Sequence, residues 1–191
     1  MARNEARRQA LSDAGLQVLA TQGARGLTHR AVDAAADVPA GTTSNYFRTR
    51  DALIAGLVDR IGERLAPAPE VLAEVGTQEP TKELFAEYLR DIVRRLLNAP
   101  EATLALIELR LEARRRPEVA DALTAWQRQG FAADVAFNQK AGLPGTAQDI
   151  ALFHYAIEGL VLDRLTTPID PQTSTDEIVQ TLVERLLPGP A

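Results

Sequence analysis

The sequence predicts an all-α protein of about nine helices, with a small N-terminal group in residues 1–60 and a larger bundle in residues 61–191. Apolar residues recur three and four positions apart in almost every segment, whereas the apolar–polar alternation of β-strands is nearly absent. Pro and Gly interrupt this pattern, and Ser or Thr precedes several segments at the position of an N-cap. The chain of 191 residues is long enough to bury a real core.

Four helices are expected in the N-terminal part, at about 4–22, 28–36, 40–46 and 50–65. The first carries one apolar face and is expected to end at Gly23 and Gly26. Thr28 can cap the second helix and Thr49 the fourth, while Pro39 breaks the chain before the third.

The Pro-rich stretch APAPEVLAEVGTQEPT, residues 66–81, is the expected junction, with room for a helical turn. One apolar stripe then runs from Leu84 to Leu97. After Pro100, the segment ATLALIELRLEA is apolar nearly all round and is therefore expected to be central. Pro117 opens a further helix, which AGLPGT at 141–146 ends.

Two capping boxes open the last helices, which are expected at about 147–166 and 175–187. The boxes are Thr146-x-x-Asp149 and Ser174-x-x-Glu177, in which each side chain bonds the backbone N–H of the other residue.

The charges divide the chain in the same place as the helices. The net charge is −5, but residues 1–50 hold seven Arg and four acidic residues, a balance of +3, and the remainder balances at −8. A basic head on an acidic body is typical of a protein that touches a polyanion with one end only, although chance unevenness gives the same pattern.

The segment 40–46 is poor in large apolar side chains, which is unusual for a helix in a folded core. Two short helices with a tight break between them, the second one polar, make a helix-turn-helix pattern. A recognition helix needs small side chains where its backbone approaches the groove, and hydroxyls or amides that reach phosphates and bases. An irregular surface loop is the alternative.

Within residues 5–60 the chain has, in this order, Leu27-Thr28, Val38, Gly41-Thr42, Phe47 and Arg50-Asp51-Ala52-Leu53. This series resembles that of the tetracycline-repressor (TetR) family of bacterial transcriptional regulators. The sequence departs from the family where Ser44 replaces the usual Tyr, Tyr46 the usual His, Pro39 the usual capping Ser, and Arg50 the usual Lys.

From the pattern and the resemblance we expect these residues to contact DNA: Thr28, Arg30, Gly41, Thr42, Thr43, Ser44, Asn45, Tyr46 and Arg50. Tyr46 would take over the phosphate contact that Ser44 cannot make. Arg50 lies at a helix N-terminus, where the helix dipole disfavours a cation unless a phosphate is near. The plain alternatives are a cap for Thr28 and a solvated surface residue for Arg30. Arg3, Arg7 and Arg8 are expected to form a basic arm that reaches along the DNA backbone or into the minor groove.

The body is expected to form a homodimer, as the resemblance also implies, because two half-sites need two heads. The interface is expected on two apolar stripes of the last two helices: Ile150, Phe153, Ile157, Gly159, Val161, Ile178, Leu182, Val183 and Leu186. The resemblance also implies a pocket for a small-molecule effector, with these candidates: Phe85, Leu89, Ile107, Arg110, Trp126, Phe131 and His154. The alternative for both sets is ordinary core.

Other classes of function find little support. The chain has no Cys, two His, no phosphate-binding Gly-rich loop and no G-x-S-x-G elbow, so neither a catalytic centre nor a metal site is expected. No apolar run approaches 18 residues, so a cytoplasmic protein without a membrane span is expected.

Together these observations predict a ligand-responsive DNA-binding regulator, a repressor by resemblance, that acts as a homodimer on a palindromic double-stranded DNA operator without a cofactor. The alternative is a helical interaction module with a degenerate helix-turn-helix that does not bind DNA.

Overall fold

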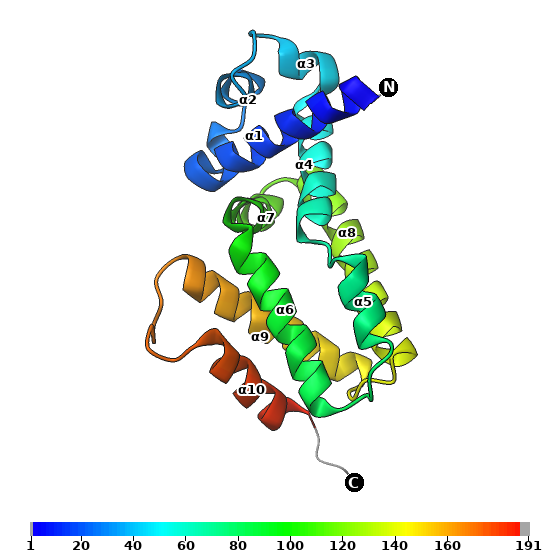
Figure 1. Cartoon of the computed structure of the whole chain (residues 1–191). Helices are drawn as coiled ribbons and strands as arrows, with labels where there is room; N and C mark the ends of the chain where they lie inside the picture. Colours follow the sequence, from blue (N-terminus) through cyan, green and yellow to red (C-terminus); the bar gives the residue numbers. More distant parts are fainter. Residues whose placement is uncertain (1, 188–191) are drawn as a thin grey trace. The chain divides into compact units, whose positions relative to one another are not determined.

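The computed structural model describes residues 2–187, and these residues form ten α-helices and no β-strand (Figure 1). The helices are α1 (Ala2–Gly26), α2 (His29–Ala35), α3 (Thr42–Tyr46), α4 (Arg50–Leu65), α5 (Pro69–Val75), α6 (Lys82–Asn98), α7 (Pro100–Ala113), α8 (Pro117–Lys140), α9 (Ala147–Leu165) and α10 (Thr175–Leu186). The all-α prediction is confirmed. The helix that the sequence did not predict is α5, which lies in the Pro-rich junction and begins with Pro69 in its first turn.

The first helix begins two residues earlier than expected and ends at the two glycines that were predicted to end it. The helical backbone breaks at Gly23, which takes a positive φ of 67°, and a last short turn ends at Gly26. Ala24 and Leu27 are buried beyond the kink. Helix α1 begins at Ala2, so Arg7 and Arg8 lie on it, and their contact with the DNA backbone or the minor groove stays a prediction.

The described residues divide into two compact units. The N-terminal unit comprises the chain up to Ala66 together with Ala99–Gln127, and the C-terminal unit comprises Pro67–Asn98 together with the chain from Arg128 onward. Packing thus groups α7 and the first half of α8 with the first four helices. The functional division at residue 60 stays a prediction.

The N-terminal unit is built around α1, which packs against α2, α4 and α7 (Figure 1). Helices α1 and α4 approach closely at Gly15, where a Cβ would lie 2.7 Å from a methyl carbon of Leu57. The largest fully buried side chains of the N-terminal unit are Leu11, Leu19, Leu27, Phe47, Leu53, Leu57, Ile61, Leu109 and Leu123.

The C-terminal unit is built from α6, α9 and α10, which pack against one another (Figure 1). Phe85 of α6 meets Phe153 of α9 edge to face, with 5.0 Å between ring centroids. Both predicted capping boxes are present, at Thr146 with Asp149 and at Ser174 with Glu177. These hydrogen bonds fix the starts of α9 and α10.

Candidate nucleic-acid interface

The turn between α2 and α3 is held by backbone geometry that few residues adopt. Thr28 caps α2 as predicted, since its Oγ1 accepts from the Ala31 N–H at 3.1 Å. After α2, Asp37 takes a left-handed φ of 50°, and the Val38 N–H donates to the Asp33 carbonyl at 3.0 Å. Gly41 then takes a φ of 91°, which glycine tolerates best, and α3 begins.

Thr43 lies on the inner side of α3, which corrects its predicted place at the DNA surface. Thr43 is 0% exposed, and its hydroxyl donates to Asp33 Oδ1 at 2.5 Å. Its N–H donates to the same oxygen, and the Gly41 N–H donates to Asp33 Oδ2, both at 2.7 Å. Thr43 therefore faces the interior of the unit, and its predicted contact with DNA is wrong.

Asp33 is a buried carboxylate that sequence reasoning missed. Burial alone would raise its pKa, but the hydrogen bonds from Thr43 and Gly41 and the nearby His29 hold the pKa below its ordinary value. The carboxylate is thus charged at neutral pH, with three donors directed at it. A polar residue in the middle of the otherwise apolar run AVDAAA was the available signal.

The outer side of α3 carries the other candidates. Ser44 and Asn45 are exposed, and Thr42 is half-buried. The Ser44 hydroxyl donates to the Gly41 carbonyl at 2.8 Å, and the Thr42 hydroxyl to the Pro39 carbonyl at 2.6 Å, so both oxygens keep lone pairs for further partners. Gly41 is exposed at the start of the helix, and Arg30 is exposed on α2.

The far end of α3 is anchored by Phe47, which is 1% exposed. The Arg8 guanidinium lies 4.4 Å from the centroid of the Phe47 ring, and His29 Nε2 bonds the Phe47 carbonyl at 2.6 Å. Tyr46 is half-buried, and its hydroxyl lies 3.4 Å from Asn4 Oδ1 of α1. The phenol of Tyr46 thus has a partner within the chain, which the predicted phosphate contact would have to share.

Arg50 is the second correction. Its Nη2 donates to the Ala24 carbonyl at 2.7 Å, and its Nη1 donates to the Leu27 carbonyl. Among the described residues, no hydrogen-bond partner reaches its buried Nε. The guanidinium thus joins the first turn of α4 to the end of α1, so we replace the predicted phosphate contact with a structural role.

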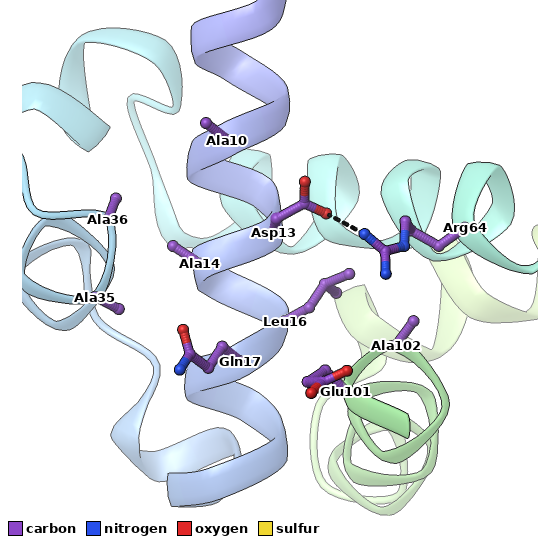
Figure 2. Close-up of a pocket in the computed structure, with 10 residues that line it drawn as sticks. All are labelled: Ala10, Asp13, Ala14, Leu16, Gln17, Ala35, Ala36, Arg64, Glu101 and Ala102. Carbon is purple, nitrogen blue, oxygen red and sulfur yellow. Dashed lines mark ion pairs between the residues drawn. The ribbon is translucent and has the colours of Figure 1, made fainter. Parts of the chain in front are cut away.

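An ion pair joins α1 to the far end of α4. Arg60 makes a two-pronged bond with Asp13, at 2.9 and 2.8 Å, and it also pairs with Glu63 at 2.6 Å. The bonds with Asp13 raise the pKa of Arg60, so this side chain stays charged. Arg64 approaches the same Asp13 at 3.7 Å, beside a groove of about 410 Å³ (Figure 2).

The candidate pocket residues do not form one cluster within either unit. Phe85 and Leu89 are buried in the core of the C-terminal unit, which is the plain alternative for them. Phe131 and His154 meet edge to face at 5.6 Å in the same unit, and His154 Nε2 lies 3.0 Å from Asp134, which the prediction missed.

The remaining pocket candidates belong to the N-terminal unit. Ile107 is half-buried and Arg110 is exposed, both on α7. The indole Nε1 of Trp126 lies 2.9 Å from the point where a Cβ on Gly62 would stand, so the ring of α8 rests on the glycine of α4.

Most of the predicted dimer residues face the core of their own chain. Five are at most 7% exposed, namely Ile150, Phe153, Ile157, Val161 and Val183, so their assignment to an intersubunit surface is wrong. Ile178, Leu182 and Leu186 are half-buried on α10, and Gly159 is exposed.

A different face of α9 is open to solvent. Tyr155 is 69% exposed, Leu162 43% and Leu152 39%, and they lie in line with Gly159 at spacings of three, four and three residues. A Cβ on Gly159 would meet no atom within 4 Å. The second apolar stripe of α9 was the signal that sequence reasoning missed.

Two negative findings apply to the described residues. In the part of the chain from 2 to 187, no three His, Cys, Asp or Glu side chains gather as a metal site would require. Over the same range, no helix has the length and apolar character needed to span a bilayer.

The C-terminal part of the chain matches a known protein family. The profile of the tetracyclin repressor-like C-terminal domain matches residues 80–189, more than half of the sequence. The chain belongs to the TetR family. No curated protein matches the sequence.

Solved structures share the whole fold. The multidrug binding protein EbrR in complex with imidazole is 28% identical, covers 97% of both chains and superposes with a TM-score of 0.67. Its complex with ethidium gives the same identity and TM-score, over 96% of this chain and 99% of EbrR. A TetR-family member from Streptomyces coelicolor is 25% identical over 96% of this chain and 99% of its own, with a TM-score of 0.68. The resemblance predicted from residues 5–60 is therefore confirmed, and the chain is a TetR-family transcriptional regulator, not an enzyme.

Proposed function

We propose that this regulator is a repressor that binds a palindromic operator as a homodimer and releases it when a small molecule binds. The observation that carries the proposal is the two-sided character of α3. Thr43 faces inward at 0% exposure, while Ser44 and Asn45 face solvent. A helix that is fixed on its inner side and polar on its outer side meets the requirement for reading base edges in a major groove.

Thr43 and Arg50 bond other residues of the chain and are left out of the proposed DNA contacts. Ser44, Asn45, Thr42 and Gly41 would face the groove, with Tyr46 at the end of the helix. Arg30 and the cap at Thr28 would reach phosphates from α2. This surface lies in the part of the chain whose net charge is +3, which favours a polyanion.

A homodimer is the second part of the proposal. The exposed stripe of Leu152, Tyr155, Gly159 and Leu162 would pair with its copy, flanked by the half-buried Ile178, Leu182 and Leu186 of α10. Gly159 leaves space for a helix to cross closely, because nothing stands where its Cβ would be. Two such copies would present two α3 helices to half-sites about 34–36 Å apart.

The effector is the third part. EbrR, at 26–28% identity, has been solved with ethidium and with malachite green, which are aromatic cations. In this chain the Asp134 carboxylate lies 3.0 Å from His154, whose ring meets that of Phe131, and a carboxylate with aromatic rings near it would suit an aromatic cation. The prediction is that ethidium binds the protein in the absence of DNA, that Asp134→Asn weakens this binding, and that Asp121→Asn, an exposed carboxylate on the same helix, does not.

The release mechanism would be a shift between two arrangements of the dimer, only one of which matches the operator. Helix α4 would be the transmitting element. It is joined to α1 at its start by Arg50 and near its end by Arg60, so a displacement of α4 carries α1 with it.

The test is DNA binding against salt concentration. Purified protein is titrated with fragments of the DNA upstream of its own coding sequence, and Arg30→Ala should lower the slope of log K against log salt by about one. The helical interaction module that has lost DNA binding predicts instead that no fragment binds above non-specific levels, and this result would refute the proposal.

A further inference from the structure

We infer that Asp33 is the clamp that positions the recognition helix α3, and this inference rests on the proposed DNA binding through α3. Asp33 lies on α2, ten residues before Thr43, and its side chain is only 3% exposed. It would be a positioning residue, since it acts on DNA through α3 and does not face solvent itself.

Helix α3 cannot hold its own shape. It has five residues, far fewer than an isolated helix needs in water. Its N-cap is Gly41, which has no side chain to accept the free N–H groups of the first turn. The helix therefore needs an acceptor from elsewhere in the fold.

Asp33 is that acceptor. Oδ2 accepts from the Gly41 N–H, and Oδ1 accepts from both the N–H and the hydroxyl of Thr43, at 2.5–2.7 Å. Bonds of this kind to a charged carboxylate are among the stronger ones in proteins, and a negative charge also suits a helix N-terminus. The backbone carbonyl of the same residue holds the turn, by accepting from the Val38 N–H.

The clamp fixes the rotation of α3 about its axis. Successive residues of an α-helix point about 100° apart, so seating Thr43 on Asp33 turns Ser44 and Asn45 toward solvent. Without the clamp, α3 would still be held at its far end by Phe47, but its first turn would lose its acceptor, and the outward residues would lose their register with the groove.

Electrostatics alone predicts the opposite sign for a test variant. Asp33→Asn removes a negative charge near a surface that binds a polyanion, so a purely electrostatic role predicts tighter binding. The clamp predicts weaker binding, because the new NH₂ group is a donor that must face either Gly41 N–H or Thr43 N–H. Asp51→Asn is the matched control, since it removes the same charge from an exposed position in the first turn of α4.

The experiment uses the full chain, labelled with ¹⁵N, and a DNA duplex from its genome of origin that the wild-type protein binds. Amide exchange of Gly41 and Thr43 is measured without DNA, and affinity is measured with it. Asp33→Asn should speed exchange at both amides about tenfold or more and weaken binding by about ten- to a hundredfold. Thr43→Val replaces the hydroxyl with a methyl group and should lose more affinity for DNA than Thr43→Ser, which keeps the hydroxyl. This pair of variants tests the clamp if Asp33→Asn does not fold.

The outcomes separate this inference from the proposed function. If exchange at Gly41 and Thr43 is unchanged in Asp33→Asn, or if that variant binds DNA more tightly as Asp51→Asn would, the clamp is refuted while DNA binding stands. If the wild type retains no fragment but exchange accelerates in Asp33→Asn, DNA binding fails while the clamp stands.

Discussion

Arg50→Ala distinguishes a structural role from a phosphate contact. The guanidinium bonds the carbonyls of Ala24 and Leu27, which follow the kink of α1 at Gly23. If this is its role, the substitution should destabilise the protein and leave the number of phosphate contacts unchanged. A phosphate contact predicts the reverse.

The magnitude follows from the two bonds. A hydrogen bond to a charged group contributes about 1.5–3 kcal/mol, and the half-burial of Arg50 places each bond at or below the lower limit. Losing both should lower the free energy of unfolding by about 2–3 kcal/mol. A chain of this length loses about 2–4 °C in Tm per kcal/mol, so Tm should fall by about 4–12 °C.

The assay combines thermal unfolding with the salt dependence of DNA binding. Arg30→Ala is the comparison, because Arg30 is exposed and should give an unchanged Tm with a slope lower by about one. Arg50→Ala should give the opposite pattern. A slope lower by about one with an unchanged Tm in Arg50→Ala would refute the structural role.

Three further predictions concern the dimer, the core and acid stability. Tyr155→Arg should convert a dimer to a monomer in sedimentation at micromolar concentration, whereas Leu111→Arg, at a 56% exposed site in the N-terminal unit, should leave a dimer; two dimers would contradict the proposed face. Phe47→Ala should cost about 3–5 kcal/mol in chemical unfolding, because the ring is 1% exposed, and a loss under 1 kcal/mol would contradict its role as an anchor. Asp33, Asp149 and Glu177 have lowered pKa values in the folded chain, so the stability they contribute is present above their unfolded pKa values and is lost as pH falls through the folded ones. Unfolding followed from pH 6 to pH 2 should therefore show declining stability below about pH 4, less steeply in Asp33→Ala, and equal slopes would count against the lowered pKa of Asp33.

The helices were predictable because their signals are local. Thr28, Thr49, Thr146 and Ser174 were expected as caps, and each accepts a hydrogen bond from the first turn of its helix. A cap depends only on its own side chain and the three residues that follow it, so it can be predicted from the sequence. The end of α1 was predicted at Gly23 and Gly26, and the helical backbone breaks at the first and ends at the second, because glycine adopts the positive φ of residue 23 at little cost.

The direction of individual side chains in the helix-turn-helix was not predictable in the same way. Thr43 and Ser44 are neighbours with the same chemistry, and it is Thr43 that faces inward, where it bonds Asp33 of another helix. Arg50 looked like a free cation at a helix start because its two carbonyl partners come from residues more than 20 positions earlier.

The predicted dimer face of α9 was wrong for a related reason. The helix has two apolar stripes, one through Phe153 and Ile157 and one through Tyr155 and Leu162. Periodicity shows that both exist, but which one is buried depends on how α6 and α10 pack against the helix. The sequence therefore predicted an apolar interface on α9 and assigned it to the wrong face.

The central claim is that the two α3 helices of a dimer bind duplex DNA together. Selection of genomic fragments tests this claim most directly. Purified protein is mixed with sheared DNA from the genome of origin, and retained fragments are sequenced. The account predicts a small set of fragments that share an inverted repeat, with half-site centres about one helical turn, or a whole number of turns, apart. Fragments retained without a common repeat, or none retained above background, would contradict it.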